Sequence, residues 1–365
     1  MQLGVFIPIG NNGWLISTTS PQYKPSYDLN KTIVEKAEKF GFDFALSMIK
    51  LRGFGGPSEF WDYNLESFTL MAGLAAVTTK IKLFATIGVL SMPAPIVARM
   101  AVTIDSISHG RFGVNIISGW QEKEYSQMGI WPGDEFYASR YEYCEEYVSI
   151  MNDLWSKGVS DHKGHFLQME DCRCLPMPTA KIEIVCAGQS DRGVKFAAEY
   201  ADYNFVASMG FNEPALVGKV ISRLVTATER TGRKCGALVL IMIIADETDA
   251  VAEAKWQHYK DGTDLEALAY RDGQANNDTV KDPMSVAGRF LPATAKRLPT
   301  NQGVLVGSYA KVAALLDELA AVPGVAGAMM TFDDFVRGME NFGTRIQPLM
   351  KSRINLPTAS HQVAA

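Results

Sequence analysis

Two apolar stretches, IKLFATIGVL (residues 81–90) and FGVNIIS (residues 112–118), decide the fold class of this chain. The segment between them is predicted to be a helix that begins near Pro95 and ends at Ile107. Near-continuous apolar runs are typical of parallel strands covered on both faces, and parallel strands need a crossover between them, usually a helix. Residues 81–118 therefore predict a strand–helix–strand unit of an α/β fold.

The same alternation continues on both sides of this unit. Six further apolar runs predict strands over residues 3–8, 43–49, 182–187, 203–207, 238–245 and 325–331. Helical patterns separate most of them, over residues 29–40, 65–77, 137–155, 190–200, 215–228, 311–321 and 335–349. Eight strands that alternate with helices predict a (β/α)8 barrel, the TIM barrel fold. A doubly wound sheet is the competing fold, but no G-x-G-x-x-G follows the first strand.

The length of 365 residues fits either two domains or one large barrel. Because no linker signature interrupts the alternation, we expect a single (β/α)8 barrel domain over residues 1–365. The polar, unpatterned stretch 261–301 is predicted to be an insertion or lid within that barrel, and residues 165–174 a short hairpin.

Composition excludes several classes of partner. The 35 basic and 40 acidic side chains give a net charge of −5, which offers no electrostatic basis for binding nucleic acid or an anionic membrane. The longest purely apolar run, residues 237–245, is too short for a membrane span. Five cysteines without a signal peptide predict reduced thiols in the cytoplasm, and the spacing of Cys172 and Cys174 fits no common zinc site, so no metal is expected.

In a (β/α)8 barrel the functional groups lie at the C-terminal ends of the strands. Asn115 lies inside a predicted buried strand, where its amide needs partners, so it is a candidate site residue. Thr86 lies inside the apolar run over residues 81–90, and Lys50 lies just after the strand over residues 43–49. Thr86 also fits an ordinary β-branched strand position, and Lys50 also fits a lysine whose ammonium extends into solvent.

A second group of candidates suits an anion. Ser190 is placed to cap the helix over residues 190–200, and helix N-termini bind phosphate through free N–H groups. Arg140 and Tyr141, on the preceding long helix, could contact the same anion. A cap without a ligand and a solvated arginine remain the alternatives.

Hydrolytic chemistry has little support. The chain contains no G-x-x-x-x-G-K-[ST], H-E-x-x-H or G-x-S-x-G, and none of its five histidines falls at a predicted strand end. Carboxylates are scarce there too, which disfavours a glycosidase. A barrel mouth of amide, hydroxyl, lysine and apolar groups suits a bound cofactor that brings its own reactivity.

The chain resembles flavin-dependent monooxygenases of the bacterial luciferase-like superfamily. The resemblance rests on stretches that follow one another along nearly the whole chain: GVFIPIGNNGWLIS (4–17), FDFALSMIKLRGFGG (42–56), IDSISHGRFGVNIISGWQ (104–121), EYSQMGIWPGDEF (124–136), VCAGQSDRG (185–193), LVGSYAKVA (305–313) and TFDDF (331–335). The SMIKLRGFGG and SGWQ…MGIWPGDEF blocks are specific to a narrower group that oxygenates pyrimidines.

This resemblance implies FMN bound at the strand ends of the barrel. The residues implied to contact FMN are Ile49, Lys50, Asn115, Glu124, Arg140, Tyr141 and Ser190. Thr86 and Asn115 are implied to hold dioxygen beside the flavin. The apolar substrate and oxygen pocket would be formed by Leu46, Met48 and Trp120.

The implied reaction is the opening of uracil or thymine. A separate NADH-dependent flavin reductase would supply reduced FMN, and molecular oxygen would be the co-substrate. A flavin peroxide would attack C4 of the pyrimidine and open the N3–C4 bond, which gives ureidoacrylate peracid. Lys50 and Asn115 are candidates for orienting the ring carbonyls, and apolar walls would exclude water.

Three alternatives stay open at this point. The first is a related monooxygenase that acts on a different N-heterocycle or cyclic amide, and the second is a flavin-binding barrel without catalysis. The third is a deazaflavin-dependent reductase. The sequence also leaves the oligomeric state open, a homo-oligomer included.

Overall fold

The computed structural model describes residues 1–280, 282–285, 287–288 and 298–353. Part of the predicted insertion (281, 286 and 289–297) and the last residues of the predicted domain (354–365) therefore lie outside the described residues.

Eight parallel strands close into a ring. Their order is β9-β11-β1-β2-β3-β4-β7-β8, and β8 pairs again with β9. The strands are β1 (Gln2–Ile7), β2 (Phe44–Ser47), β3 (Lys82–Gly88), β4 (Phe112–Ile117), β7 (Glu183–Ala187), β8 (Tyr203–Ala207), β9 (Gly236–Asp246) and β11 (Val325–Phe332). Each lies within a few residues of a strand predicted from the sequence. The first and last strands pair in parallel, with Val5 opposite Met330, so the (β/α)8 prediction is confirmed.

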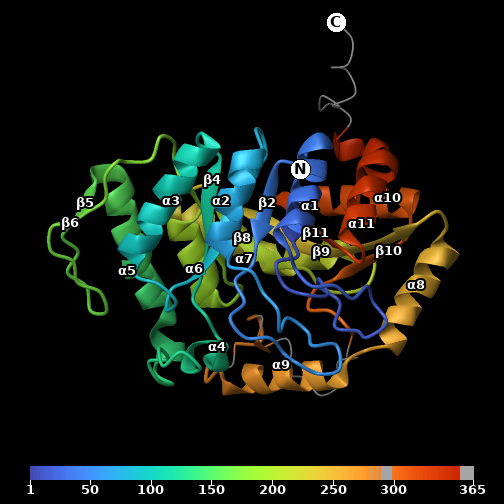
Figure 1. The fold of residues 1–365 in the computed structure, drawn as a ribbon, viewed down its shortest axis with the longest axis horizontal. Helices are drawn as coiled ribbons and strands as arrows, with labels where there is room; N and C mark the ends of the chain where they lie inside the picture. The colour runs from blue at the N-terminus through green and yellow to red at the C-terminus, as the bar shows by residue number, and fades with distance from the viewer. Residues whose placement is uncertain (281, 286, 289–297, 354–365) are drawn as a thin grey trace, which may run out of the picture.

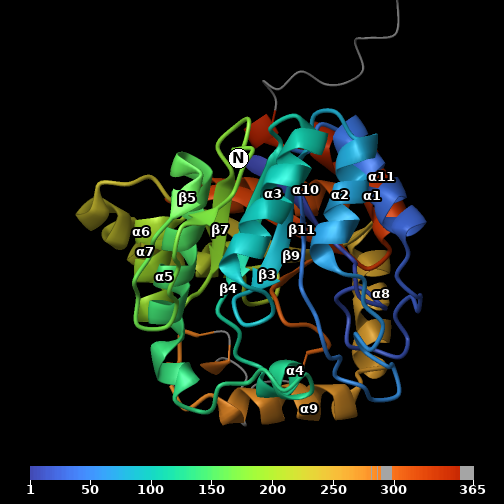
Figure 2. The same ribbon diagram turned by 60° about the vertical axis from the view of Figure 1, so that its left-hand side comes forward.

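Helices cover the outside of the ring (Figures 1 and 2). They are α1 (Tyr27–Lys39), α2 (Ser67–Val77), α3 (Ala94–Ser108), α5 (Phe136–Lys157), α6 (Asp191–Tyr200), α7 (Gly218–Thr231), α8 (Asp249–Asp261), α10 (Tyr309–Ala320) and α11 (Phe335–Asn341). Helix α1 illustrates why these segments form helices. The Ser26 side chain accepts a hydrogen bond from the Leu29 N–H at the N-cap, and Ile33, Val34 and Ala37 form one buried face.

Two elements after β9 were not predicted from the sequence. Strand β10 (Val304–Ser308) pairs in parallel with Met242–Asp246, the part of β9 that extends beyond its pairing with β8. Helix α8 follows β9 in the chain and ends where the predicted insertion begins. β10 is five residues long and lies outside the ring, so it leaves a weaker sequence pattern than the eight runs that complete the barrel.

The insertion also contains regular structure, contrary to the expectation of an unpatterned stretch. Helix α9 (Leu265–Asn277) is capped by Asp264, whose carboxylate accepts from the N–H groups of Glu266 and Ala267. Outside the insertion, a short helix, α4 (Glu122–Ser126), follows β4. Both lie at the same end of the molecule in Figures 1 and 2, and the Lys123 N–H donates to Gln274 Oε1 over 3.2 Å.

Two further predictions change in detail. The excursion after α5 is paired antiparallel between β5 (Val159–Ser160) and β6 (Cys172–Arg173), so the hairpin begins before residue 165. The closing helix predicted over 335–349 is interrupted, because a π-helical turn, Phe342–Ile346, follows α11. No helix among the described residues is long and apolar enough to cross a membrane. All five cysteines are free thiols.

Candidate active site

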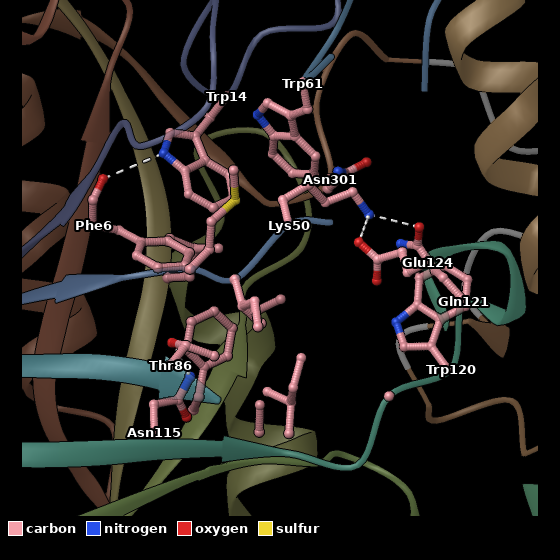
Figure 3. Close-up of a pocket in the computed structure, with 18 of the residues that line it drawn as sticks. Phe6, Trp14, Lys50, Trp61, Thr86, Asn115, Trp120, Gln121, Glu124 and Asn301 are labelled. Carbon is pink, nitrogen blue, oxygen red and sulfur yellow. Dashed lines mark hydrogen bonds and ion pairs between the residues drawn. The ribbon is translucent and has the colours of Figure 1, made fainter. Parts of the chain in front are cut away.

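A cavity of about 190 Å³ opens at the C-terminal ends of the strands, and we call it the chamber. Its walls are largely aromatic and come from Phe6, Trp14, Phe54, Trp61, Trp120 and Phe205. Phe6 and Trp14 stack with ring centroids 4.2 Å apart, and the indole Nε1 of Trp14 donates to the Phe6 carbonyl oxygen (Figure 3). The indole N–H of Trp61 donates to the Gly13 carbonyl oxygen over 2.7 Å. The two rings therefore present apolar surface to the chamber while their polar atoms are satisfied by backbone.

Thr86 and Asn115 lie on adjacent strands at one side of the chamber (Figure 3). Asn115 Nδ2 donates to Thr86 Oγ1 over 2.9 Å, and the Thr86 hydroxyl in turn donates to the Ser47 carbonyl oxygen. Because the hydroxyl proton is used for Ser47, Thr86 Oγ1 must accept from the amide NH₂, which orients the amide. Asn115 Oδ1 is left buried without a partner among the described residues. A buried acceptor of this kind is a site for a ligand N–H.

Lys50 lies across the chamber from this pair (Figure 3). Its Nζ lies 2.9 Å from Glu124 Oε1 and donates to Gln121 Oε1 over 2.6 Å. It also lies over the ring of Phe54, 4.6 Å from the centroid. Burial lowers the pKa of Lys50 below its ordinary value, and the charge of Glu124 offsets part of that effect. Lys50 is thus a buried cation fixed by one carboxylate, one amide and an aromatic face.

A second cavity, of about 120 Å³, adjoins the chamber, and we call it the anion end. The two cavities share Trp120, Ala187 and Phe205 among their lining residues. Arg140, Tyr141 and Ser190 all line the anion end. Burial raises the pKa of Tyr141, so its hydroxyl keeps its proton near neutral pH.

Two glycines allow the loop after β7 to approach the helices here. A Cβ on Gly188 would lie 2.7 Å from the Tyr141 hydroxyl oxygen, and one on Gly193 would lie 2.5 Å from it. Ser190 Oγ accepts from the Gly193 N–H over 3.1 Å and so caps α6. The first turn of α6 and Tyr141 are therefore packed together around the anion end, which any larger residue at either glycine would disturb.

Acidic side chains from the insertion reach the same place. Arg140 Nη1 lies 2.9 Å from Asp278 Oδ2, and both side chains are buried. The N–H of Asp191, the first residue of α6, donates to Asp282 Oδ2 over 3.1 Å. Arg140 Nε is buried and has no partner among the described residues. The cationic group and the helix N-terminus that suit an anion are thus already in contact with carboxylates.

The structure gathers nearly all of the sequence-predicted residues at these two cavities. Ile49, Met48, Trp120 and Glu124 line the chamber together with Lys50, Thr86 and Asn115. Leu46 does not line either cavity and is fully buried in β2, beside Phe84 of β3.

Sequence reasoning missed several chamber residues. Trp14 lies in the loop after β1, Trp61 in the loop after β2, and Gln302 just before β10. The tryptophans follow strand ends in the chain, which is a signal that could have found them. Nothing in the local sequence identifies Gln302 or Asp278 as a site residue. Asp278 lies inside the predicted insertion, and Gln302 directly follows it.

Comparison with known proteins agrees with this geometry. The family model described as luciferase-like monooxygenase matches residues 1–326. The chain is 62% identical to pyrimidine monooxygenase RutA of Bradyrhizobium sp. strain BTAi1, over 97% of this chain and 98% of that protein. It is 58% identical to pyrimidine monooxygenase RutA of Serratia proteamaculans strain 568, over the full length of both.

Solved structures with the same fold are more distant in sequence. A crystal structure of riboflavin lyase RcaE, with modified FMN and riboflavin as substrate, superposes with a TM-score of 0.81 at 16% identity, over 98% of this chain and 94% of that one. This likeness concerns the fold. The family match and the full-length identities show that the chain belongs to the luciferase-like monooxygenase family and, within it, to the group of the RutA pyrimidine monooxygenases.

Proposed function

We propose that this chain is a flavin-dependent monooxygenase that opens uracil or thymine between N3 and C4 to give ureidoacrylate peracid. FMN, reduced by a separate NADH-dependent flavin reductase, is the proposed cofactor, and dioxygen is the co-substrate. The names of relatives at 62% and 58% identity over essentially their full lengths support the substrate class. The free thiols of all five cysteines are consistent with work in the reducing cytoplasm.

One observation carries the proposal: an aromatic chamber with fixed neutral amides is continuous with an end that suits an anion. A flavin mononucleotide has this division, since its ring system is uncharged and its phosphate is a strong anion. The site fits the phosphate because Arg140 Nε lacks a partner among the described residues and the Ser190 cap begins α6 beside it. It fits the ring because Asn115 Oδ1 is an unpaired acceptor on the chamber wall.

When bound, the reduced flavin supplies the electrons that activate dioxygen. The residues of the chain position the reacting molecules and surround them with apolar side chains. The aromatic walls exclude water from the reacting atoms, and Ile49, Met48 and Trp120 extend that apolar lining. We propose that Asn115 contacts dioxygen or the flavin and that Thr86 positions it, since the Thr86 proton is used for Ser47.

Lys50 is proposed to orient a carbonyl of the pyrimidine. An ammonium carries three donors, and among the described residues Gln121 and Glu124 accept two of them. The remaining donor is available for an oxygen that gains negative charge as the ring opens, in a chamber where such a contact is strong. Glu124 holds Lys50 in place and also accepts from the Leu51 N–H over 3.1 Å.

The proposal is tested with the full-length protein, a competent flavin reductase, NADH, FMN, uracil and labelled dioxygen. We expect mass spectrometry to show ring-opened product that carries label, formed only when FMN and reductase are both present. Loss of uracil without label, or no loss at all while other N-heterocycles react, would rule out this substrate and this chemistry. Peroxide release alone, with every substrate, would indicate a flavin-binding barrel without catalysis.

A further inference from the structure

Gln302 resembles Asn115 in its surroundings, although the two are far apart in the chain. It lines the chamber, is 5% exposed, and lies directly before Gly303 and β10. Its Nε2 donates to Thr331 Oγ1 over 2.9 Å. Its Oε1 is buried and has no partner in the part of the chain that the structure describes.

The orientation of the Gln302 amide is determined by Thr331. The Thr331 hydroxyl lies 3.5 Å from both the Ile241 carbonyl oxygen and Met242 Sδ, so its proton has an acceptor other than Gln302. Thr331 Oγ1 then accepts from the amide NH₂, and the amide oxygen is the atom left over. The pairing of Asn115 with Thr86 follows the same rule. The chamber is thus lined by two threonine-oriented amides, Asn115 and Gln302, whose oxygens have no partner among the described residues.

The backbone at Gln302 is also held in place. The Gly303 N–H donates to the Ser208 carbonyl oxygen over 3.1 Å, and a Cβ on Gly303 would lie 2.7 Å from the Met209 carbonyl oxygen. This contact places the chain against the end of β8. The amide of Gln302 is therefore preorganised by both its backbone and its side chain, as a specificity contact requires.

The strands that carry Thr331 and Asn115 lie on opposite sides of the ring. Thr331, which holds Gln302, lies on β11, and Asn115 lies on β4. In the closed ring, β1, β2 and β3 separate β11 from β4 on one side, and β9, β8 and β7 separate them on the other. Arg140 and Ser190 line the anion end, whereas Gln302 does not. A phosphate held by Arg140 and Ser190 would therefore not contact Gln302.

We infer that Gln302 determines substrate specificity by accepting a ring N–H of the cyclic amide. This inference rests on the proposed function and adds a residue to it. A uracil ring carries two N–H groups beside carbonyls, and a buried acceptor without another partner discriminates strongly against an analogue that lacks the matching N–H. A methyl group on that nitrogen would remove the donor and also collide with the amide oxygen.

The test compares uracil, 1-methyluracil and 3-methyluracil as substrates of the full-length protein with its reductase. We expect the wild type to reject at least one methylated ring. In Gln302→Met, kcat/KM for uracil should fall about tenfold to a hundredfold. Turnover of the rejected analogue should fall much less, so that the preference for uracil shrinks while the Kd of FMN stays unchanged. Thr331→Val should shift the preference in the same direction but less, because the amide remains and loses only its orientation.

Gln257→Met, an exposed glutamine on α8, is the matched control and should behave like the wild type. An equal loss of activity on uracil and on the methylated ring would overturn the inference, and so would a change in FMN affinity alone, which would assign Gln302 to the flavin. If the wild type opens no pyrimidine, the proposed function fails and this inference fails with it. Wild-type activity without any change of preference in Gln302→Met refutes the inference only.

Discussion

The chamber and the anion end hold their polar groups in different ways. In the chamber, Asn115 and Gln302 are neutral amides oriented by Thr86 of β3 and Thr331 of β11, and each leaves one oxygen without a partner among the described residues. At the anion end, Arg140 is a buried cation whose partner, Asp278, comes from the insertion. Neutral groups on barrel strands are rigid and incur no charge penalty, whereas a buried charge needs a counter-charge until its ligand arrives. The orientation of Asn115 is therefore built into the barrel strands, whereas the charge balance of Arg140 depends on the insertion.

The largest effect is expected from the chamber. Asn115→Ala should lower coupled oxygenation at least about a hundredfold, because a preorganised contact to the reacting atoms is lost. FMN affinity should change less than tenfold, since at most one neutral hydrogen bond to the flavin is removed. Loss of coupled oxygenation is measured as the amount of product formed per NADH consumed, together with the amount of peroxide released. FMN affinity is measured separately by titration. Thr86→Val should give a smaller loss through misorientation of the amide, and an unchanged product yield in Asn115→Ala would refute the role.

The next effect concerns the charge at the anion end. Arg140→Ala should weaken FMN binding about tenfold to a hundredfold, because a charge-assisted contact is lost, and should leave riboflavin binding unchanged. The loss should shrink as salt is added. Fluorescence titration with both flavins measures it. Arg192→Ala, on the exposed face of α6 beside Glu142, is the control; equal weakening of both flavins by Arg140→Ala would contradict a phosphate contact.

A change of opposite sign is expected at the partner carboxylate. Asp278→Asn should tighten FMN binding by about twofold to tenfold, because a like charge next to the phosphate is removed. Riboflavin affinity should not change. The same variant should lower the stability of the flavin-free protein, since Arg140 loses its buried counter-charge. Weaker FMN binding in Asp278→Asn would show instead that the carboxylate orients Arg140 for the phosphate.

The smallest effect is the pH dependence that Lys50 contributes to stability. Burial lowers its pKa below the ordinary 10.5, so between the lowered value and 10.5 the unfolded state binds more protons than the folded state. In that window the contribution of Lys50 to the free energy of unfolding rises with pH, by at most about 1.4 kcal/mol per pH unit. Lys50→Met should remove this slope. Denaturant unfolding of the wild type and of Lys50→Met at several pH values in this range measures the difference. If the free energy of unfolding changes with pH in the same way in both proteins, the lowered pKa is contradicted.

Much of the fold was predictable because it depends on local pattern. The eight barrel strands are apolar runs that must be buried on both faces, so each is recognisable without knowing its neighbours. Position at strand ends also selected Thr86, Asn115 and Lys50, and all three line the chamber. Glu124 was named only through the family resemblance, because nothing around it in the sequence marks a buried acid.

The rest depended on pairings between distant segments. Helix α9 has a weakly amphipathic sequence. Its buried polar residue Gln274 accepts a hydrogen bond from the Lys123 N–H of α4, a contact that the sequence around α9 does not reveal. Strand β10 pairs with the extension of β9 and forms a parallel bridge from Val304 to Phe211, in the segment after β8. Leu46 was placed in the pocket only by the family resemblance, and in the structure it is fully buried and lines neither cavity, because successive side chains of a strand point to opposite faces.

By itself, the sequence determined the closed barrel and the strand ends where its chemistry lies, since periodicity and burial are local properties of the chain. Only the tertiary structure decided which polar atoms in the site lack partners. Arg140 and Asp278 are 138 residues apart, and Gln302 meets Thr331 across 29 residues that include β10 and α10. Whether an amide oxygen or a guanidinium nitrogen is satisfied depends on such contacts, and a hydrogen bond requires its partners within about 3 Å, a distance that no local pattern encodes.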